Sequence, residues 1–157
     1  LIGKTFGHLE QSCFLKENYS IIDGNPPEIN LINEKNNGEM VLKLIERKLV
    51  LSAHDISNGG LLIALSEMSM GSNLGIKIEK SKKLRDLKEY FFGEDQGRYV
   101  LEIDEKNLTT VEKFLKSGSI YYEIIGKTQE KFFEIENEMK IETNSLYKVN
   151  NQWYNNY

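Results

Sequence analysis

The sequence is nearly without cysteine, and this limits the chemistry it can carry. Cys13 is the only cysteine among the 157 residues, which excludes an internal disulfide framework and a cysteine-based metal cluster. Ser12 and Cys13 also lack a nearby histidine–acid pair in the sequence, so we discount a hydrolase that uses either residue as its nucleophile.

Long apolar runs and excess positive charge are also missing. The longest apolar stretches, such as 61–65, fall far short of the roughly 20 residues that span a bilayer, and no basic leader with an apolar run opens the chain. The net charge of -4 gives no overall attraction to a phosphate backbone. We therefore expect a cytoplasmic protein with neither a membrane nor a nucleic acid as its partner.

The sequence nevertheless has what a folded domain needs. Hydrophobic residues make up 39% of the chain, and a chain of this length can bury a core without disulfides. The chain begins with Leu1-Ile-Gly-Lys-Thr rather than with Met, and we expect it to be a piece of a longer protein.

The spacing of apolar residues and of turn formers predicts an alternation of helices and strands. The predicted helices are 7–19, 28–47, 61–70, 81–91, 107–116 and a terminal one over 145–154. The predicted strands are 49–53, which we expect to be buried, then 74–79, 98–104, 121–126, 131–136 and 139–142. The last strands are separated by short connections such as the polar turn 127–130, which favours an α+β fold with a mixed sheet over a doubly wound parallel one.

A strand that ends in a carboxylate and turns through paired glycines into a helix can hold a metal-bound phosphate. Asp55 would bind Mg²⁺, Gly59 and Gly60 would let phosphate oxygens approach backbone N–H groups, and His54 would orient Asp55. The pattern alone favours a purely structural interpretation, because Gly-Gly without lysine is not a phosphate-binding P-loop. In that interpretation Asp55 or Ser57 caps the helix, and the glycines only permit a tight turn.

The loop 92–99 gathers a second set of polar side chains between glycines. Arg98 can bind a phosphate or carboxylate through paired N–H donors, and Gln96 offers both a donor and an acceptor. Arg98 can equally pair with Glu94 or Asp95 and only fasten the loop.

These motifs stand in a recognisable order along the chain. The segments are Gly7-His-Leu-Glu-Gln-Ser12, Pro26-Pro27, Ser52-Ala-His-Asp-Ile-Ser-Asn-Gly-Gly-Leu-Leu62 and Phe92-Gly-Glu-Asp-Gln-Gly-Arg-Tyr99. Together they resemble the end of the large subunit of the phosphoribosylformylglycinamidine synthase family. The resemblance implies a layered α/β/α fold with a mixed sheet and partial ferredoxin-like topology, of the type found in the C-terminal domain of aminoimidazole ribonucleotide synthetase.

The resemblance also implies a division of the chain. Residues 1–19 correspond to the end of a preceding domain, 20–27 to a linker, 28–142 to the C-terminal α/β domain and 143–157 to a tail with a helix.

The implied activity is that of an ATP-dependent amidoligase. Members of this family convert formylglycinamide ribonucleotide to formylglycinamidine ribonucleotide in purine synthesis, with glutamine as the amide donor. Mg²⁺ and ATP or ADP are the implied cofactors of the whole enzyme, and the implied partners are the remaining domains and a glutaminase that supplies ammonia. We expect no catalytic residue and no tightly bound cofactor in this segment, which should be inactive alone.

The resemblance assigns a role to the residues around the glycine pair. Asp55 is expected to be a metal ligand in an auxiliary nucleotide site, with His54, Gly59 and Gly60 near the nucleotide phosphates.

The second loop corresponds to a substrate-binding loop of a related domain in the same family. Glu94, Gln96 and Arg98 are expected to form a pseudo-substrate loop at the equivalent position. Asp95 stands where serine is common there, and a carboxylate repels phosphate unless a metal intervenes.

Two other interpretations remain. One is a different ATP-dependent member of the superfamily, either an aminoimidazole ribonucleotide synthetase or a selenophosphate synthetase; the lead 7–12 and the loop 94–98 argue against both. The other is a non-enzymatic interaction module.

Overall fold

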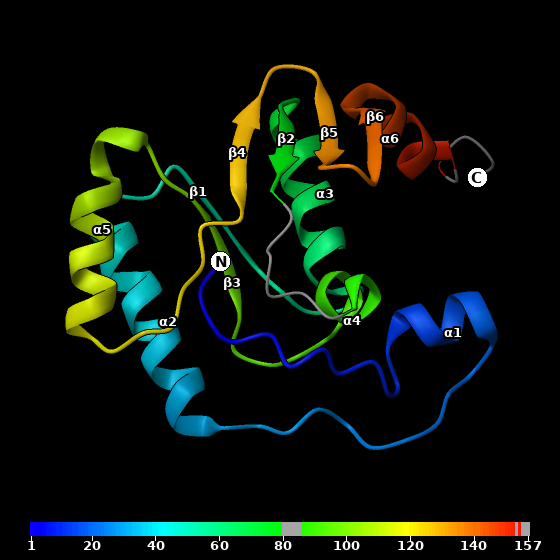
Figure 1. Cartoon of the computed structure of the whole chain (residues 1–157), viewed down its shortest axis with the longest axis horizontal. Coiled ribbons are helices and arrows are strands. Elements are labelled where there is room, and N and C mark those ends of the chain that lie inside the picture. The colour runs from blue at the N-terminus through cyan, green and yellow to red at the C-terminus, as the bar shows by residue number, and fades with distance from the viewer. Residues whose placement is uncertain (80–85, 153, 155–157) are drawn as a thin grey trace. The chain divides into compact units, whose positions relative to one another are not determined.

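The computed structural model describes residues 1–79, 86–152 and 154, which form two compact units (Figure 1). Unit 1 consists of residues 1–64 and 86–124, and unit 2 of the described residues within 65–85 and 125–157. The helices are α1 (Cys13–Tyr19), α2 (Leu31–Glu46), α3 (Gly60–Ser72), α4 (Leu87–Phe92), α5 (Glu105–Ser117) and α6 (Thr143–Asn151). The strands are β1 (Ser52–Asp55), β2 (Gly75–Ile78), β3 (Tyr99–Glu102), β4 (Gly126–Gln129), β5 (Phe132–Ile135) and β6 (Met139–Glu142).

Unit 1 is organised around a small antiparallel sheet. β1 pairs with β3, and the N-terminal residue Ile2 forms isolated bridges to Tyr99 and Tyr122. α2 and α5 lie side by side in Figure 1 and supply most of the core. Its buried members are Ile2, Met40, Val41, Leu44, Val111, Leu115 and Ile120.

Local capping determines where these two helices begin. Asn30 caps α2 by accepting a hydrogen bond from the Asn33 backbone N–H at 3.0 Å, and Asp104 caps α5 in the same way. α2 continues without a break through Asn36-Asn37-Gly38, although these residues have low helix propensity. Asn37 is buried and donates its amide to the Gly97 carbonyl at 2.8 Å, and this contact fastens the middle of the helix to the loop before β3.

The first helix is shorter than predicted. α1 begins at Cys13 with Ser12 as its cap, whereas residues 7–11 form an irregular loop. Gly7 has a φ of +82° and Gln11 one of 55°, and neither conformation fits a right-handed helix. Apolar spacing alone predicted a helix here, and the backbone contacts of this loop, described below, override it.

The predicted buried strand 49–53 is displaced and exposed. β1 begins at Ser52, most of its residues are exposed, and the preceding Leu51 is 64% exposed. In the described part of the chain β1 pairs on one side only, with β3, so it is an edge strand. The expectation of burial was therefore wrong for this unit, because an apolar sequence does not reveal whether a second strand covers it.

Unit 2 contains the mixed sheet that the sequence predicted. The strand order is β4-β2-β5-β6, with β2 parallel to β5 and the other pairs antiparallel. The predicted polar turn 127–130 was wrong, because residues 126–129 form β4 and pair with β2. Of the predicted strand 121–126, Tyr122 forms an isolated bridge and Gly126 begins β4. The α+β class with a mixed sheet is thus confirmed.

The interior of unit 2 is built from alternate residues of the central strands. Phe133 is fully buried and Ile78 is 1% exposed. Two hydroxyl groups also make polar contacts within this unit. Ser69 Oγ lies 3.3 Å from Thr143 Oγ1 and donates to the Leu74 carbonyl. The predicted terminal helix exists as α6, although it begins at Thr143. Of the predicted helix 81–91, residues 81–85 lie outside the described residues, and the remainder overlaps α4, which ends one residue later at Phe92.

The two compact units do not follow the predicted division at residues 20, 28 and 143. Ile2 is 2% exposed within the core of unit 1, so the first residues pack with the segment that we assigned to the C-terminal domain. That division stays a prediction about the longer protein. Among the residues described, no helix combines the length and apolar character needed to cross a membrane.

Candidate functional site

The loop between α4 and β3 centres on a buried carboxylate. Asp95 is 4% exposed, and its carboxylate accepts hydrogen bonds from three consecutive backbone N–H groups, those of residues 6–8, at 3.0, 3.0 and 3.2 Å. Charge-assisted bonds of this kind are stronger than neutral ones. They hold the segment before α1 in its irregular conformation and explain why a helix does not form there.

Arg98 provides the positive charge beside this carboxylate. Its side chain is fully buried, and Nη2 lies 3.8 Å from Asp95 Oδ2. The guanidinium also donates to the Thr5 hydroxyl at 3.1 Å and to the backbone carbonyls of Asp95 and Gly93. Burial lowers the pKa of Arg98, and the Asp95 carboxylate opposes this effect. All of these partners belong to the protein, so the buried donors of Arg98 are used within the fold.

Glu94 joins the loop to two other segments. Its Oε1 accepts hydrogen bonds from the Cys13 N–H at 2.8 Å and from the Gly59 N–H at 2.7 Å. Burial and the nearby Glu94 carboxylate raise the pKa of the Cys13 thiol. A thiol shifted in this direction is a poorer nucleophile at neutral pH.

The glycine pair is required by close packing. Gly59 and Gly60 have φ values of +81° and +71°, a region that favours glycine. A Cβ at Gly60 would lie 2.7 Å from the Phe91 carbonyl oxygen and 2.8 Å from that of Gly93. The turn therefore packs against the end of α4, and the Gly59 N–H, which we had assigned to phosphate, bonds to Glu94 here.

His54 and Asp55 lie in a different environment from Glu94 and Asp95. The Asp55 side chain is 68% exposed, and His54 Nδ1 lies 3.7 Å from its Oδ1 and 2.5 Å from its backbone oxygen. Asp55 pairs with Tyr99 across β1 and β3. Burial raises the pKa of the Tyr99 hydroxyl, and the carboxylates of Glu34 and Asp55 add to this shift. Asp55 is thus a carboxylate at the end of an edge strand, accessible to a ligand.

A resident magnesium ion needs several oxygen ligands, and its fit to this chain is partial. Within the described ranges no group of three or more histidine, cysteine or acidic side chains is placed to hold a metal. Asp55 can supply one carboxylate oxygen, but the backbone donor of Gly59 is engaged by Glu94. Ligands from outside this chain would have to complete such a site.

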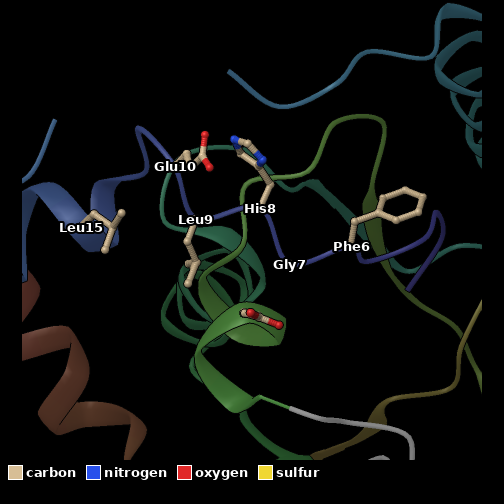
Figure 2. A pocket seen from close by; sticks show the side chains of 7 residues that line it. Phe6, Gly7, His8, Leu9, Glu10 and Leu15 are labelled. Carbon is tan, nitrogen blue, oxygen red and sulfur yellow. The ribbon is translucent and has the colours of Figure 1, made fainter. Parts of the chain in front are cut away.

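A shallow pocket of about 480 Å³ lies along the loop before α1 and next to α4 (Figure 2). Figure 2 shows the side chains of His8 and Glu10 on one side of this loop and that of Leu9 on the other. His8 Nε2 lies 2.9 Å from the Asn25 carbonyl oxygen, and Glu10 accepts the Asn25 N–H at 2.6 Å. These polar groups fasten the segment after α1, and none of the predicted site residues lines the pocket.

The structure thus brings some predicted residues together and separates others. Glu94 binds the Gly59 turn, and Arg98 is buried beside the neighbouring Asp95, whereas Gln96 in the same loop is exposed and Asp55 lies at the strand end. Sequence reasoning missed the part played by residues 5–8, which act through backbone groups and one threonine hydroxyl. The available signal in the sequence was the glycine at position 7, because glycine favours the positive φ that this residue adopts.

The comparisons with known proteins agree with this architecture. Residues 7–135 match the family described as AIR synthase related protein, C-terminal domain. The chain is 44% identical over its full length to the phosphoribosylformylglycinamidine synthase subunit PurL of Pelagibacter ubique, covering 22% of that protein. It is 35% identical, again over its full length, to the PurL subunit of Rhodopseudomonas palustris strain BisB5, covering 21% of it. The chain therefore spans about a fifth of the length of the curated relatives it matches.

Solved structures share the fold. PurLQS from Thermotoga maritima aligns with a TM-score of 0.64 and 21% identity, covering 85% of this chain and 24% of that one. Thermotoga maritima PurL complexed with ATP aligns with a TM-score of 0.62 and 19% identity, covering 72% of this chain and 21% of that one. At this level of identity the likeness concerns the fold alone, and it agrees with the α+β class assigned from the strand order.

Proposed function

Because the chain belongs to the family of AIR synthase related C-terminal domains, we propose that it is the C-terminal part of a phosphoribosylformylglycinamidine synthase. The complete enzyme would be a cytoplasmic, ATP-dependent amidoligase that converts formylglycinamide ribonucleotide to its amidine, with Mg²⁺ as cofactor and ammonia from a glutaminase. The observation that carries this proposal is the 44% identity to a PurL subunit along the entire chain.

Within that enzyme we assign this chain an architectural role. Glu94, Asp95 and Arg98 are bound to the protein's own backbone, which leaves few charged groups free to act on a substrate. Unit 1 also exposes many large apolar side chains, which a longer protein would cover. The most exposed are Phe6, Ile22, Ile29, Leu31, Ile32 and Leu51, each above 60%.

The contact of this chain with a nucleotide is proposed to be Asp55. It is an accessible carboxylate at a strand end, next to the turn that precedes α3. Carboxylate oxygen is the ligand type that Mg²⁺ prefers, and the remaining ligands would come from other domains. His54 and Gly60 would lie near the nucleotide, and Gln96 is the exposed member of the proposed pseudo-substrate loop.

A chimeric enzyme tests the proposal. We would replace the C-terminal segment of the Pelagibacter ubique PurL subunit with this chain and measure ATP- and ammonia-dependent formation of the amidine product. The expected result is activity within about tenfold of the parent, because interdomain contacts between sequences of this identity are only partly preserved. A chimera that folds, by circular dichroism and gel filtration, but forms no amidine would contradict the assignment.

The same chimera isolates the role of Asp55. Asp55→Ala should lower the amount of ADP and Mg²⁺ that copurifies with the chimera while leaving the unfolding midpoint of the nucleotide-free chimera unchanged. Glu46→Ala, at an exposed carboxylate on α2, is the matched control and should change neither. Full nucleotide and metal content in Asp55→Ala would remove Asp55 from the nucleotide site without affecting the assignment of the enzyme.

A further inference from the structure

Residues 5–8 surround the Asp95 carboxylate as a binding site surrounds an anion. Three successive backbone N–H groups converge on its two oxygens, with Gly7 in the left-handed region at the centre. Successive N–H groups in such a conformation form a concave nest that binds phosphates and other anions in many proteins. Here the anion is a side chain of the same protein.

The second component of an anion site is a fixed positive charge, and Arg98 provides it. The guanidinium is fully buried, 3.8 Å from Asp95 Oδ2, and its bonds to the Thr5 hydroxyl and the Gly93 carbonyl fix its orientation. These bonds do not involve the Asp95 side chain, so they would hold the guanidinium in place without that carboxylate. The positive charge would then remain buried without an anion, which is costly.

We infer that the N–H groups of residues 6–8 and the guanidinium of Arg98 form an oxyanion-binding site that the Asp95 carboxylate occupies. Its ligand class is a small carboxylate, because removal of the Asp95 side chain beyond Cβ leaves space of the size and planarity of formate. In the natural chain the site is closed to free anions. This inference would hold whatever reaction the longer protein carries out, and it excludes the loop 94–98 from binding a ligand phosphate at this point.

Chemical rescue tests the inference in the 157-residue chain. Asp95→Ala should be strongly destabilised in chloride buffer, and sodium formate should restore stability in a saturable way. At about 300 mM formate the folded-to-unfolded ratio should rise roughly tenfold above that in sodium chloride of equal ionic strength. Urea unfolding followed by circular dichroism measures this ratio. If the variant is unfolded in chloride, the same titration should show formate-dependent folding.

Three controls separate site binding from general salt effects. The natural chain should respond equally to formate and chloride, because Asp95 fills the site. Asp95→Asn retains the shape of the side chain and should also show no formate response, whatever its stability. Asp104→Ala removes a half-buried capping carboxylate that accepts one backbone N–H at 3.1 Å, and formate should not rescue it.

The opposite results would overturn the inference. If formate fails to stabilise or fold Asp95→Ala beyond chloride, the nest does not bind a free carboxylate. An equal response in Asp95→Asn or Asp104→Ala would show that formate acts on the protein as a whole. Specific rescue by inorganic phosphate in place of formate would show that the site has a larger shape than we infer.

Discussion

Two segments of unit 1 carry the acidic residues that the sequence singled out, and the fold treats them in opposite ways. Around Glu94 and Asp95, carboxylates are bound by backbone N–H groups from the loop before α1, from Cys13 and from the Gly59 turn. Asp55, at the end of β1, has a side chain that is 68% exposed. The first segment fastens three parts of the chain to one another, and the second leaves its carboxylate accessible.

This difference shows what decides whether a polar motif is structural. A buried carboxylate must be paired with donors because its desolvation is costly, and a protein can provide those donors from its own backbone. Once they are used, the motif has little left for a ligand. An exposed carboxylate such as Asp55 has no such requirement, and the two segments should therefore respond very differently to substitution.

The largest difference should come from Arg98. Arg98→Ala leaves the Asp95 carboxylate buried without its cation, and we expect a loss of about 3–5 kcal/mol in the free energy of unfolding. Urea unfolding measures this loss of unfolding free energy. Arg47→Ala, at an exposed arginine whose guanidinium lies 4.8 Å from the Phe114 ring centre, should cost about 0.5–1 kcal/mol. Comparable losses of unfolding free energy in the two variants would show that the buried Arg98 contributes no more to stability than an exposed arginine.

Gly60 tests whether the glycine pair is there for packing. Gly60→Ala places a Cβ 2.7 Å from the Phe91 carbonyl oxygen at a positive φ, and we expect a loss of about 2–4 kcal/mol. Gly71→Ala, in the same helix α3, meets no atom within 4 Å and should gain about 0.5–1 kcal/mol from helix propensity. Both thermal and urea unfolding should show that Gly60→Ala is destabilised and Gly71→Ala is stabilised. If Gly60→Ala leaves the free energy of unfolding unchanged, packing does not explain this glycine, and ligand binding becomes the alternative explanation.

Another carboxylate, Glu123, should give a smaller effect that depends on pH. The hydroxyl groups of Tyr90 and Tyr121 both donate to it. The bond to Glu123 raises the pKa of Tyr121 from 10.0 to about 12, and burial followed by Glu123 raises that of Tyr90. Because both folded-state values exceed the unfolded value, this contribution is complete below pH 10 and declines as the pH rises toward 12.

Substitution of Glu123 measures this contribution. Glu123→Gln should make the decline of unfolding free energy between pH 10 and 12 shallower than in the natural chain. Glu46→Gln should leave the decline between pH 10 and 12 unchanged. If the decline persists in full after Glu123→Gln, another group is responsible for it.

Asp55 should show the smallest effect on stability. Because its carboxylate is exposed, Asp55→Ala should change the unfolding free energy of the isolated chain by no more than about 0.5 kcal/mol. Asp95→Ala provides the contrast in the same assay. A loss above about 2 kcal/mol for Asp55→Ala would mean that Asp55 acts structurally after all and would remove the difference between the two segments.

Much of the fold could be predicted because local signals and tertiary contacts agree. The apolar helix at 61–70 and the spacing in 107–116 correspond to α3 and α5, with ends differing by a few residues. The prediction failed where distant groups determine the backbone. The predicted helix included residues 7–11, but the carboxylate of Asp95, which is distant in the sequence, binds the N–H groups of Gly7 and His8. Likewise, the polar residues 126–129 form β4 because β2 pairs with them.

The candidate site could be predicted only as a set of residue types. The sequence offered Glu94 and Asp95 as alternative partners of Arg98, and the observed partner is Asp95. It could not indicate that Glu94 binds the Gly59 turn, because this contact joins two motifs that each looked like a separate ligand site. The exposure of Asp55 likewise depends on the edge position of β1, which the sequence of the strand does not encode.

The position of β2 within its sheet has a consequence for the order of folding. β2 pairs on both sides with strands that are synthesised later, β4 and β5. During synthesis it therefore has no sheet partner until α4, β3 and α5 have been made, and its pairing must close a long loop. We expect unit 2 to be the last part of the chain to become protected from hydrogen exchange, with β2 and β5 acquiring protection together.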